Sequence, residues 1–311
     1  MNLLDRYLRF IKFHAQNHGE KTGHECLRNV DNIHPELSEV SSYRSNNSGA
    51  ISAGHSHDGN HGVDSSASHL LIVWRPINGA KLTVSVGWGV MITVKKVLYI
   101  GGHGKIGLLS APLISEKGYE IHSLVRNPDQ APEIEKLGAT PVIKDITELS
   151  VDEWADLLTL YDVVVWGAGN GGRGGAELTT AVDRDGALAT IDALEQLKAA
   201  GKPTPKYVMI SYVGATHNTA NPDDTSWYAY VEAKKAVDNR LNASQLDYLI
   251  LGPSALSDEP AEGIEVLESP STEKETSREL VAQVVAEIVG RDEFPNTPLE
   301  FYNGTNPVSS I

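Results

Sequence analysis

Short apolar runs alternate with amphipathic segments over residues 91–311. The apolar runs are rich in β-branched and aliphatic side chains, which predicts buried strands. We expect strands at 97–100, 121–125, 141–143, 163–166, 207–210, 248–251 and 299–302. Between them, helical periodicity predicts helices near 105–118, 129–138, 151–160, 177–200, 227–244 and 276–290. This alternation predicts an α/β fold in which helices cover both faces of a doubly wound, mostly parallel sheet, in a single domain.

The first 90 residues follow a different pattern. Residues 2–16 carry apolar side chains near helical spacing, which predicts a short amphipathic helix. The segment 38–68 is rich in serine, asparagine, glycine and histidine, a composition that cannot bury enough apolar surface to order itself. We therefore expect a low-complexity, mostly disordered N-terminal extension over 1–90, followed by the folded domain over 91–311.

Two features near the end of this extension bear on its structure and origin. Apolar runs at 70–74 and 82–88 flank Asn78-Gly79, a dipeptide that favours a β-hairpin turn. Met91 leads directly into the first predicted strand of the domain. We hypothesise that Met91 is the natural start and that residues 1–90 are an added or wrongly assigned segment.

Charge is distributed unevenly along the chain. The 311 residues hold 26 Lys and Arg against 41 Asp and Glu, a net charge of −15. Residues 1–90 hold 8 of each sign, so the whole excess lies in 91–311. A domain this acidic argues against nucleic acid or an anionic membrane surface as a partner, because both require clustered cations. We expect a small-molecule substrate, and the oligomeric state stays open.

Cysteine and histidine usage limits the possible sites further. Cys26 is the single cysteine, which excludes a disulfide framework and any cysteine-rich metal site and favours a reducing compartment. No apolar run reaches the length of a membrane span or a signal peptide, so we expect a cytoplasmic protein. His55, His57 and His61 offer imidazoles that suit transition metals, but a polar, flexible tract lacks fixed partners to orient them. We expect no metal site.

A glycine-rich loop joins the first strand and the first helix of the domain. Its glycines follow the pattern Gly-x-x-Gly-x-x-Gly, and the loop reads Gly101, Gly102, His103, Gly104, Lys105, Ile106, Gly107. In this position glycines permit a tight turn, close approach of the backbone to a pyrophosphate, and close helix–strand packing. The helix start supplies unpaired N–H groups to the phosphates. The loop predicts a dinucleotide site in a Rossmann-like fold.

The end of the second strand indicates which dinucleotide is preferred. A site for NAD carries an acidic residue there, whereas this strand ends at Val125 and continues Arg126-Asn127-Pro128. A guanidinium suits a 2′-phosphate, so Arg126 favours NADP over NAD, with NAD as the alternative. Arg126 as a solvated loop cation is the competing interpretation.

A tyrosine and a lysine with helical spacing form the candidate catalytic pair. Tyr230 and Lys234 are four residues apart in a predicted helix, so they share a face. An ammonium beside a phenol lowers the pKa of the phenol, as proton transfer near neutral pH requires. The spacing alone arises readily by chance. The pair gains weight because the fifth strand ends in Ser211, at the sheet edge where open α/β folds bind ligands.

Taken together, these motifs resemble the short-chain dehydrogenase/reductase superfamily, and within it the atypical members with a Gly-x-x-Gly-x-x-Gly loop, described as NAD(P)-binding oxidoreductases or epimerase-like proteins. The resemblance covers about residues 94–305. It implies an NAD(P)-binding Rossmann domain over 91–311. It also implies that Ser211 orients a carbonyl, that Tyr230 is the general acid/base, and that Lys234 lowers the pKa of Tyr230 and holds the nicotinamide ribose.

The same resemblance assigns further residues by position. It implies that Asp145 lies near the adenine, that Gly167, Ala168 and Gly169 line the cofactor, and that Asp183 stands where classical relatives carry an active-site Asn. Two departures affect the substrate side. The family's usual Arg-Pro-Gly is replaced by Gly252-Pro253-Ser254, and only 77 residues follow Lys234. A short C-terminal part predicts a small substrate or an open pocket.

These observations predict an NADP(H)-dependent oxidoreductase of the atypical short-chain type that acts on a small carbonyl or alcohol. Two alternatives remain open. The first is a non-catalytic NADP(H)-binding redox sensor, a class that typically lacks the Tyr/Lys pair. The second is an NAD(P)-dependent epimerase, which would use the same groups through a transient keto intermediate.

Overall fold

The structure is a computed structural model that describes residues 83–86, 90–170, 174–267 and 274–311. Contacts divide the chain into two units, Met1–Val94 and Lys95–Ile311. In the described part of the first unit, β1 (Thr83–Val86) pairs antiparallel with β2 (Val90–Thr93). The apolar run 82–88 contains β1, which pairs with β2, whereas the run 70–74 that would be its partner in the predicted hairpin lies outside the described residues.

The other predictions for the N-terminal region fall outside the described residues. They are the helix at 2–16, the disorder over 38–68, the Asn78-Gly79 turn and the histidine cluster.

The second unit is built on an eight-stranded sheet. Its strands are β3 (Lys96–Ile100), β4 (Glu120–Val125), β5 (Thr140–Ile143), β6 (Val163–Trp166), β7 (Lys206–Ile210), β8 (Tyr248–Pro253), β10 (Ile264–Val266) and β12 (Leu299–Asn303). They lie in the order β10-β12-β8-β7-β6-β3-β4-β5. All neighbours from β12 to β5 are parallel, and β10 is antiparallel to β12. The predicted doubly wound, mostly parallel sheet is confirmed.

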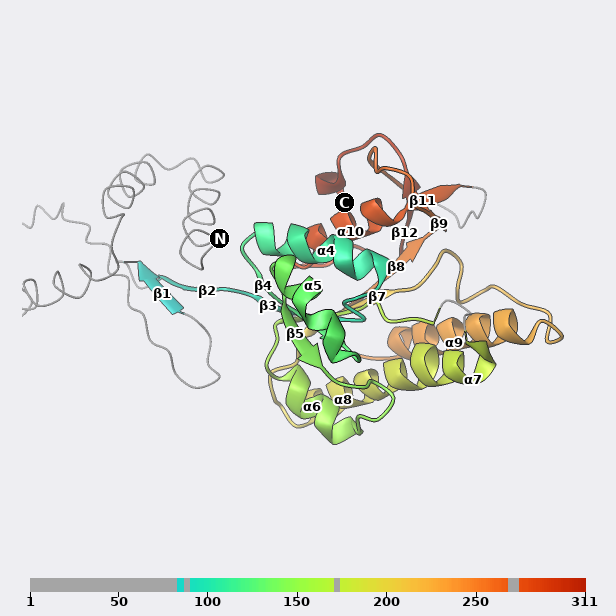
Figure 1. Cartoon of the computed structure of the whole chain (residues 1–311), viewed down its shortest axis with the longest axis horizontal. Helices are drawn as coiled ribbons and strands as arrows, with labels where there is room; N and C mark the ends of the chain where they lie inside the picture. The colour runs from blue at the N-terminus through green and yellow to red at the C-terminus, as the bar shows by residue number, and fades with distance from the viewer. Residues whose placement is uncertain (1–82, 87–89, 171–173, 268–273) are drawn as a thin grey trace, which may run out of the picture. The chain divides into compact units, whose positions relative to one another are not determined.

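Helices cover both faces of this sheet. They are α4 (Lys105–Glu116), α5 (Ala131–Lys136), α6 (Val151–Leu158), α7 (Gly175–Thr179), α8 (Ala187–Ala199), α9 (Thr225–Asn242) and α10 (Arg278–Ile288), with short turns η1 (Pro128–Gln130), η2 (Thr180–Gly186) and η3 (Val308–Ser310). In Figure 1, α4 and α10 lie side by side on one side of the sheet, and α6 and α8 lie on the other. None of the described helices is long and apolar enough to cross a membrane.

Alternating side chains of the central strand belong to two separate cores. Val97 and Tyr99 pack with α4, α5 and α10, whereas Leu98 and Ile100 pack with α6, α8 and α9. These residues are fully buried. A strand buried on both faces must be apolar at every position, which is why the run reads as continuous rather than alternating.

The strand order creates a crevice at one edge of the sheet. From β3 the chain adds β4 and β5 on one side and then returns to place β6 on the other side. The loops that leave the carboxyl ends of β3 and β6 therefore diverge, and open α/β sheets bind ligands at this point.

The long helix predicted at 177–200 is interrupted. It divides into α7, the π-helical turn η2 and α8. Within η2, Gly186 lies against the sheet, where a Cβ would approach the Trp166 ring to 3.2 Å. The π-helical turn η2 is wider than an α-helical turn and places Asp183 in the interior, so that only 1% of the residue is exposed. Such π-turns are frequent at functional sites.

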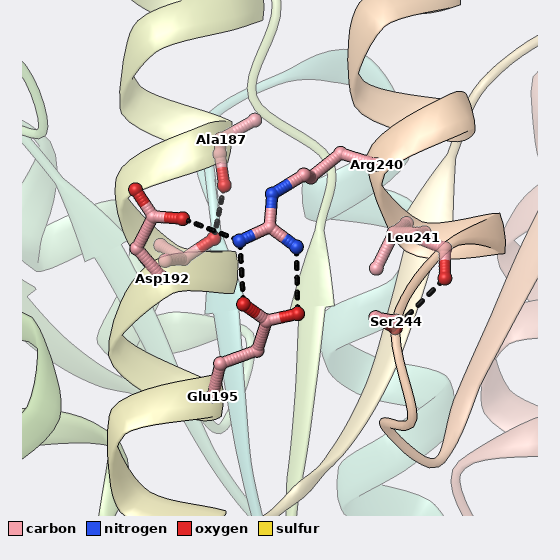
Figure 2. A network of polar contacts seen from close by, with 7 residues as sticks. Ala187, Asp192, Glu195, Arg240, Leu241 and Ser244 are labelled. Carbon is pink, nitrogen blue, oxygen red and sulfur yellow. Dashed lines mark hydrogen bonds and ion pairs between the residues drawn. The ribbon is translucent and has the colours of Figure 1, made fainter.

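An arginine fork joins two helices on one face of the sheet (Figure 2). Arg240 of α9 donates from Nη1 to Glu195 Oε1 of α8 at 2.6 Å, and its Nη2 pairs with the other oxygen of Glu195. Nη2 also donates to Asp192 Oδ1 at 3.0 Å. A bidentate guanidinium–carboxylate pair fixes the relative orientation of its two helices more strictly than a single contact does. The fork thereby helps to position α9.

Besides β2 and β10, two further short strands of the described chain were not predicted. β9 (Ala255–Ser257) pairs in parallel with β11 (Glu275–Ser277), which directly precedes α10. Ser277 then caps α10 by accepting a hydrogen bond from the N–H of Leu280. Segments this short show no periodicity from which a strand is recognised.

Candidate active site

The glycine loop packs tightly against the two strands beside β3. Gly101 has φ of 86°, and a Cβ there would lie 2.6 Å from the Ala168 Cα. A Cβ at Gly102 would lie 2.4 Å from that of Ser123, and one at Gly107 would lie 2.8 Å from the Gly102 carbonyl oxygen. These distances are shorter than atoms tolerate, so each of the three positions requires glycine.

The glycine loop places the start of α4 at the crevice, and within the described residues the first N–H groups of this helix make no hydrogen bond. Gly104 is the N-cap residue and offers no side chain, and the first turn contains no acidic residue. Within the described residues, the N–H groups of Lys105, Ile106 and Gly107 have no acceptor. Free donors and the positive end of the helix dipole favour an anion such as a diphosphate.

A cavity of about 320 Å³ opens at the divergence of β3 and β6. Its walls come from the carboxyl ends of β3, β4, β5 and β6 together with η2. The lining residues are Gly101, His103, Gly104, Leu124, Val125, Arg126, Gln130, Lys144, Asp145, Ile146, Gly167, Ala168, Gly169, Asn170, Leu178 and Val182. The structure thus brings most of the predicted cofactor residues around one hollow. The predicted residues that do not line it are Gly102, Lys105, Ile106, Gly107 and Lys234.

One end of the cavity carries two cations and a carboxylate. Arg126 Nη1 lies 3.8 Å from Asp145 Oδ2, and 70% of the Arg126 side chain is exposed. Hydrogen bonds from Thr147 hold the pKa of Asp145 below its ordinary value, and the nearby Arg126 guanidinium adds to this. Lys144 also lines the cavity. Arg126 is therefore only loosely engaged and keeps donors for a ligand.

His103 and Lys105 form contacts away from the predicted phosphate position. The His103 ring lies 2.8 Å from Glu133 Oε2 and 3.0 Å from Gln130 Nε2, which ties the loop to η1 and α5. Lys105 Nζ pairs with Asp258 Oδ2 at 2.7 Å. Both side chains are paired with neighbouring segments. For Lys105, the group that remains available to a cofactor is therefore its backbone N–H.

Beside the cavity lies a group of polar side chains that we call the buried polar cluster and define as Asp183, Ser211, Tyr230, Lys234 and Asp238. Tyr230 is half-buried and the other four are buried. Ser211 follows β7 and donates its hydroxyl proton to Asp238 Oδ2 at 2.6 Å. Lys234 Nζ donates to the Ile210 carbonyl at 3.0 Å. Both Lys234 and Ser211 are 5% exposed. The ammonium has two further donors for which the described residues offer no hydrogen-bond acceptor.

Tyr230 and Lys234 share the inner side of α9, as predicted, but the pKa of the tyrosine shifts the other way. The sequence predicts a pKa lowered by Lys234. In the structure burial raises the pKa of Tyr230 well above its ordinary value, and the charges of Asp183 and Asp238 raise it further. The physical reason for this correction is that desolvation and the charges of two buried carboxyl groups disfavour the phenolate, and Lys234 is not among the groups that shift this pKa.

Aromatic rings surround Tyr230. Its ring stacks with those of Tyr212 and Trp227 at centroid distances of 5.6 Å and 5.4 Å. Trp227 stays 45% exposed. Within the described residues the Tyr230 hydroxyl makes no hydrogen bond, so it remains available to a ligand.

Asp183 connects the cavity with the buried polar cluster. Its Oδ2 accepts a hydrogen bond of 2.8 Å from the N–H of Asn170, which lines the cavity. Its Oδ1 is buried without a partner. Burial raises the pKa of Asp183, while the charge of Lys234 and the Asn170 hydrogen bond oppose the rise. A buried, half-satisfied carboxyl between the two regions indicates a ligand-binding position.

Asp238 and the aromatic neighbours were missed at the sequence level. Asp238 follows Lys234 by one helical turn, so the spacing rule that paired Tyr230 with Lys234 also reaches Asp238. Tyr212 and Trp227 offered no comparable signal, because Tyr212 comes from a loop after β7 and meets α9 only in the folded chain.

Comparisons with known proteins cover this same region. The sequence model of a family described as NAD(P)H-binding matches residues 101–292. YhfK of Bacillus subtilis, named as an uncharacterized sugar epimerase, is 31% identical over 215 residues, which are 69% of this chain and 97% of that protein. YMR090W of Saccharomyces cerevisiae, a UPF0659 protein, is 30% identical over 231 residues, 70% of this chain and 96% of that protein.

A solved structure is similar over the same extent. A protein of Bacillus halodurans, named as a candidate NAD-dependent epimerase/dehydratase, superposes with a TM-score of 0.59 and 29% identity. The match covers 70% of this chain and 97% of that one. The residues matched by the family model begin in the glycine loop and include the whole buried polar cluster.

Proposed function

The chain belongs to the NAD(P)H-binding family and binds a nicotinamide dinucleotide, and from that premise we propose that it is an NADP(H)-dependent oxidoreductase that reduces a small carbonyl compound. The observation that carries the proposal is the junction at Asp183. This residue contacts the cavity through Asn170, and its charge acts on both Lys234 and Tyr230. A dinucleotide site therefore adjoins a group able to transfer a proton.

The residues present fit the dinucleotide. The glycine loop packs closely against β4 and the segment after β6, and the start of α4 offers free N–H donors. Lys234 keeps two donors for the hydroxyls of a ribose. When bound, the reduced nicotinamide supplies a hydride, that is two electrons and one hydrogen, to the carbonyl carbon.

Tyr230 completes the reduction by donating a proton. A tyrosine phenol is protonated at neutral pH and the raised pKa of Tyr230 keeps it so, which makes Tyr230 a proton donor and not a base in this step. As the carbon–oxygen π bond breaks, the carbon gains the hydride and the oxygen gains the proton of Tyr230. The carbonyl compound is reduced to an alcohol, the dinucleotide is oxidised, and the phenolate regains a proton from water.

The test replaces the phenol hydroxyl alone. NADPH oxidation is measured against a panel of small aldehydes, ketones, quinones, flavins and nucleotide sugars. With the best substrate, we expect Tyr230→Phe to lower kcat about 100-fold or more, because the acid is lost, while NADPH binding measured by fluorescence stays within about twofold.

Tyr228→Phe is the matched control, since Tyr228 is an exposed phenol on the same helix. It should retain full turnover. Unchanged turnover in Tyr230→Phe would exclude Tyr230 as the acid.

The preference for NADP rests on the two cations at the end of the cavity. Arg126 and Lys144 both line it, and the guanidinium of Arg126 is mostly exposed. Guanidinium groups bind phosphates through paired donors. We expect Arg126→Ala to weaken NADPH binding about tenfold or more and to leave NADH binding nearly unchanged.

Arg184→Ala is the control for charge alone, because Arg184 pairs only with its neighbour Asp185 in the described residues. Fluorescence titrations of both dinucleotides measure the effect. Tighter binding of NADH than of NADPH by the unaltered protein would contradict the preference.

Epimerisation is the second candidate, favoured by the name of the YhfK relative. An epimerase of this kind oxidises and re-reduces one carbon of its substrate, so it consumes no dinucleotide overall. The panel separates the two activities. A nucleotide sugar that isomerises without net NADPH loss, detected by NMR, would identify an epimerase.

A further inference from the structure

The carboxyl group of Asp238 is buried without an ion pair. It lies on α9, one turn beyond Lys234, and is 2% exposed. Its Oδ2 accepts the Ser211 hydroxyl proton, and its Oδ1 has no hydrogen-bond partner. Burial of a carboxylate in this way costs free energy, and one hydroxyl donor offsets that cost only in part.

The protonation state of Asp238 determines what Ser211 offers to a ligand. A serine hydroxyl has one proton to donate and two lone pairs to accept with. An ionised carboxylate only accepts, so it takes the Ser211 proton, and Ser211 then offers lone pairs alone. A protonated carboxyl can donate to the Ser211 oxygen instead, which frees the Ser211 proton for another acceptor.

We propose that Asp238 is a positioning residue that acts through Ser211 and selects whether the site binds a carbonyl compound or the corresponding alcohol. With Asp238 protonated, Ser211 donates to a carbonyl oxygen. With Asp238 ionised, Ser211 accepts from the hydroxyl group of an alcohol. This inference rests on the proposed function, because it assigns Ser211 to the oxygen that Tyr230 protonates.

The surroundings of Asp238 place its titration in an accessible range. Burial raises its pKa to about 6, the Ser211 hydrogen bond and the charge of Lys234 oppose the rise, and the charge of Glu300 on β12 adds to it. The charge of Asp238 acts in turn on the phenols of Tyr212, Tyr230 and Tyr248.

The remaining charged groups near α9 are already paired or act on Lys234. On α8, Asp192 and Glu195 are bound by Arg240. On η2, Asp183 interacts with Lys234. Burial raises the pKa of Asp183 as well, so a change near pH 6 in the behaviour of Ser211 is assigned to Asp238 by its direct hydrogen bond to Ser211 and by the loss of this change in Asp238→Asn.

The first experiment reads the carboxyl group directly and requires no turnover. The protein is labelled with ¹³C at the aspartate side chains, and the Asp238 signal is identified by its loss in Asp238→Asn. We expect its NMR titration to be centred near pH 6 and to move upward in Ser211→Ala, because that variant removes the hydrogen bond that favours the ionised form. A carboxyl that is fully ionised above pH 5, or one that is insensitive to Ser211→Ala, would overturn the proposal.

The second experiment tests the consequence for binding. NADPH-dependent reduction of diacetyl is measured between pH 5 and pH 8, and oxidation of acetoin with NADP⁺ in parallel. We expect the KM for diacetyl to rise about tenfold between pH 5 and pH 7, as one titration near pH 6 requires. The KM for acetoin should fall over the same range, and kcat should change less than either KM.

Two variants separate this role from a structural one. Asp238→Asn should remove the pH dependence of both KM values and keep NADPH binding, measured by fluorescence. Asp156→Asn, an exposed aspartate on α6, should keep the pH dependence. An unchanged pH profile in Asp238→Asn would overturn the inference. Absence of turnover with every carbonyl probe would instead contradict the proposed function, and the NMR titration would still decide the state of the Ser211–Asp238 pair.

Discussion

Gly101 is the point at which the glycine loop comes closest to the segment after β6. A Cβ there would lie 2.6 Å from the Ala168 Cα, and the backbone has φ of 86°. We expect Gly101→Ala to lower the free energy of unfolding by about 3 kcal/mol, about 1–2 of it from left-handed strain and the rest from steric overlap. Urea denaturation measures the loss, and a fluorescence titration should show weaker NADPH binding.

Gly175 provides the matched comparison. It has φ of 87°, but a Cβ there would meet no atom within 4 Å. Gly175→Ala should therefore show only the strain, about 1–2 kcal/mol. An equal loss of stability in the two variants would mean that Gly101 is required for its backbone conformation and not for the close approach.

Single residues also show how far local patterns reach. The glycine loop, Arg126 and the Tyr230/Lys234 pair were recognised because turn chemistry and helical spacing are local properties. The raised pKa of Tyr230 was not predicted. It depends on Asp183, which comes from a distant segment, and on desolvation by neighbouring elements. Spacing along a helix contains neither quantity.

At the scale of elements, α9 carries three members of the buried polar cluster, and the Arg240 fork attaches it to α8. We expect Arg240→Gln to lower the free energy of unfolding by about 1 kcal/mol, because the pairs are partly exposed but form a network. It should also lower kcat, since α9 positions Tyr230. Thermal denaturation and the NADPH oxidation assay measure the two effects.

Arg184→Gln is the control at this scale. Arg184 pairs with its neighbour Asp185 and joins no two helices. It should change the melting temperature by less than the error of the measurement. A similar loss in both variants would show that the Arg240 effect reflects net charge and not the connection of α8 to α9.

Element boundaries followed the sequence where the pattern was regular and departed from it at the site. The seven predicted strands all appear, because strands of a covered parallel sheet have a distinctive apolar run, which β5 keeps although none of its residues is buried. The predicted helix at 177–200 divides at η2. Helical periodicity continues through a π-turn with little change, so the pattern does not reveal the turn that places Asp183.

At the scale of the molecule, the protonation of an acidic side chain that joins two strands affects stability at low pH. A hydrogen bond from His122 is the main cause that lowers the pKa of Glu120, and this network links β3 with β4 through Lys96. A lowered pKa means that ionised Glu120 stabilises the fold above its usual value of 4.5. That contribution is lost as the pH falls through the lowered pKa.

We therefore expect Glu120→Gln to be less stable than the unaltered protein at pH 7, by at most about 1 kcal/mol because the pair is partly exposed. The difference should disappear as the pH falls below the lowered pKa of Glu120. Urea denaturation across this range measures the difference. Glu135→Gln, which changes an exposed glutamate on α5, should be neutral across the same range. A constant difference between Glu120→Gln and the unaltered protein would exclude the linkage.

The sequence by itself determined the parallel α/β fold, the dinucleotide loop and the helix that carries Tyr230 and Lys234. Each of these features depends on neighbours within a few residues or on the period of apolar side chains, and both kinds of pattern can be recognised in the sequence. Only the tertiary structure decided that Ser211 meets Asp238, that Asp183 joins the cavity to the buried polar cluster, and that the pKa of Tyr230 is raised. These properties arise from burial and from charges brought together across β7, η2, α9 and β12, and linear order does not encode such distances.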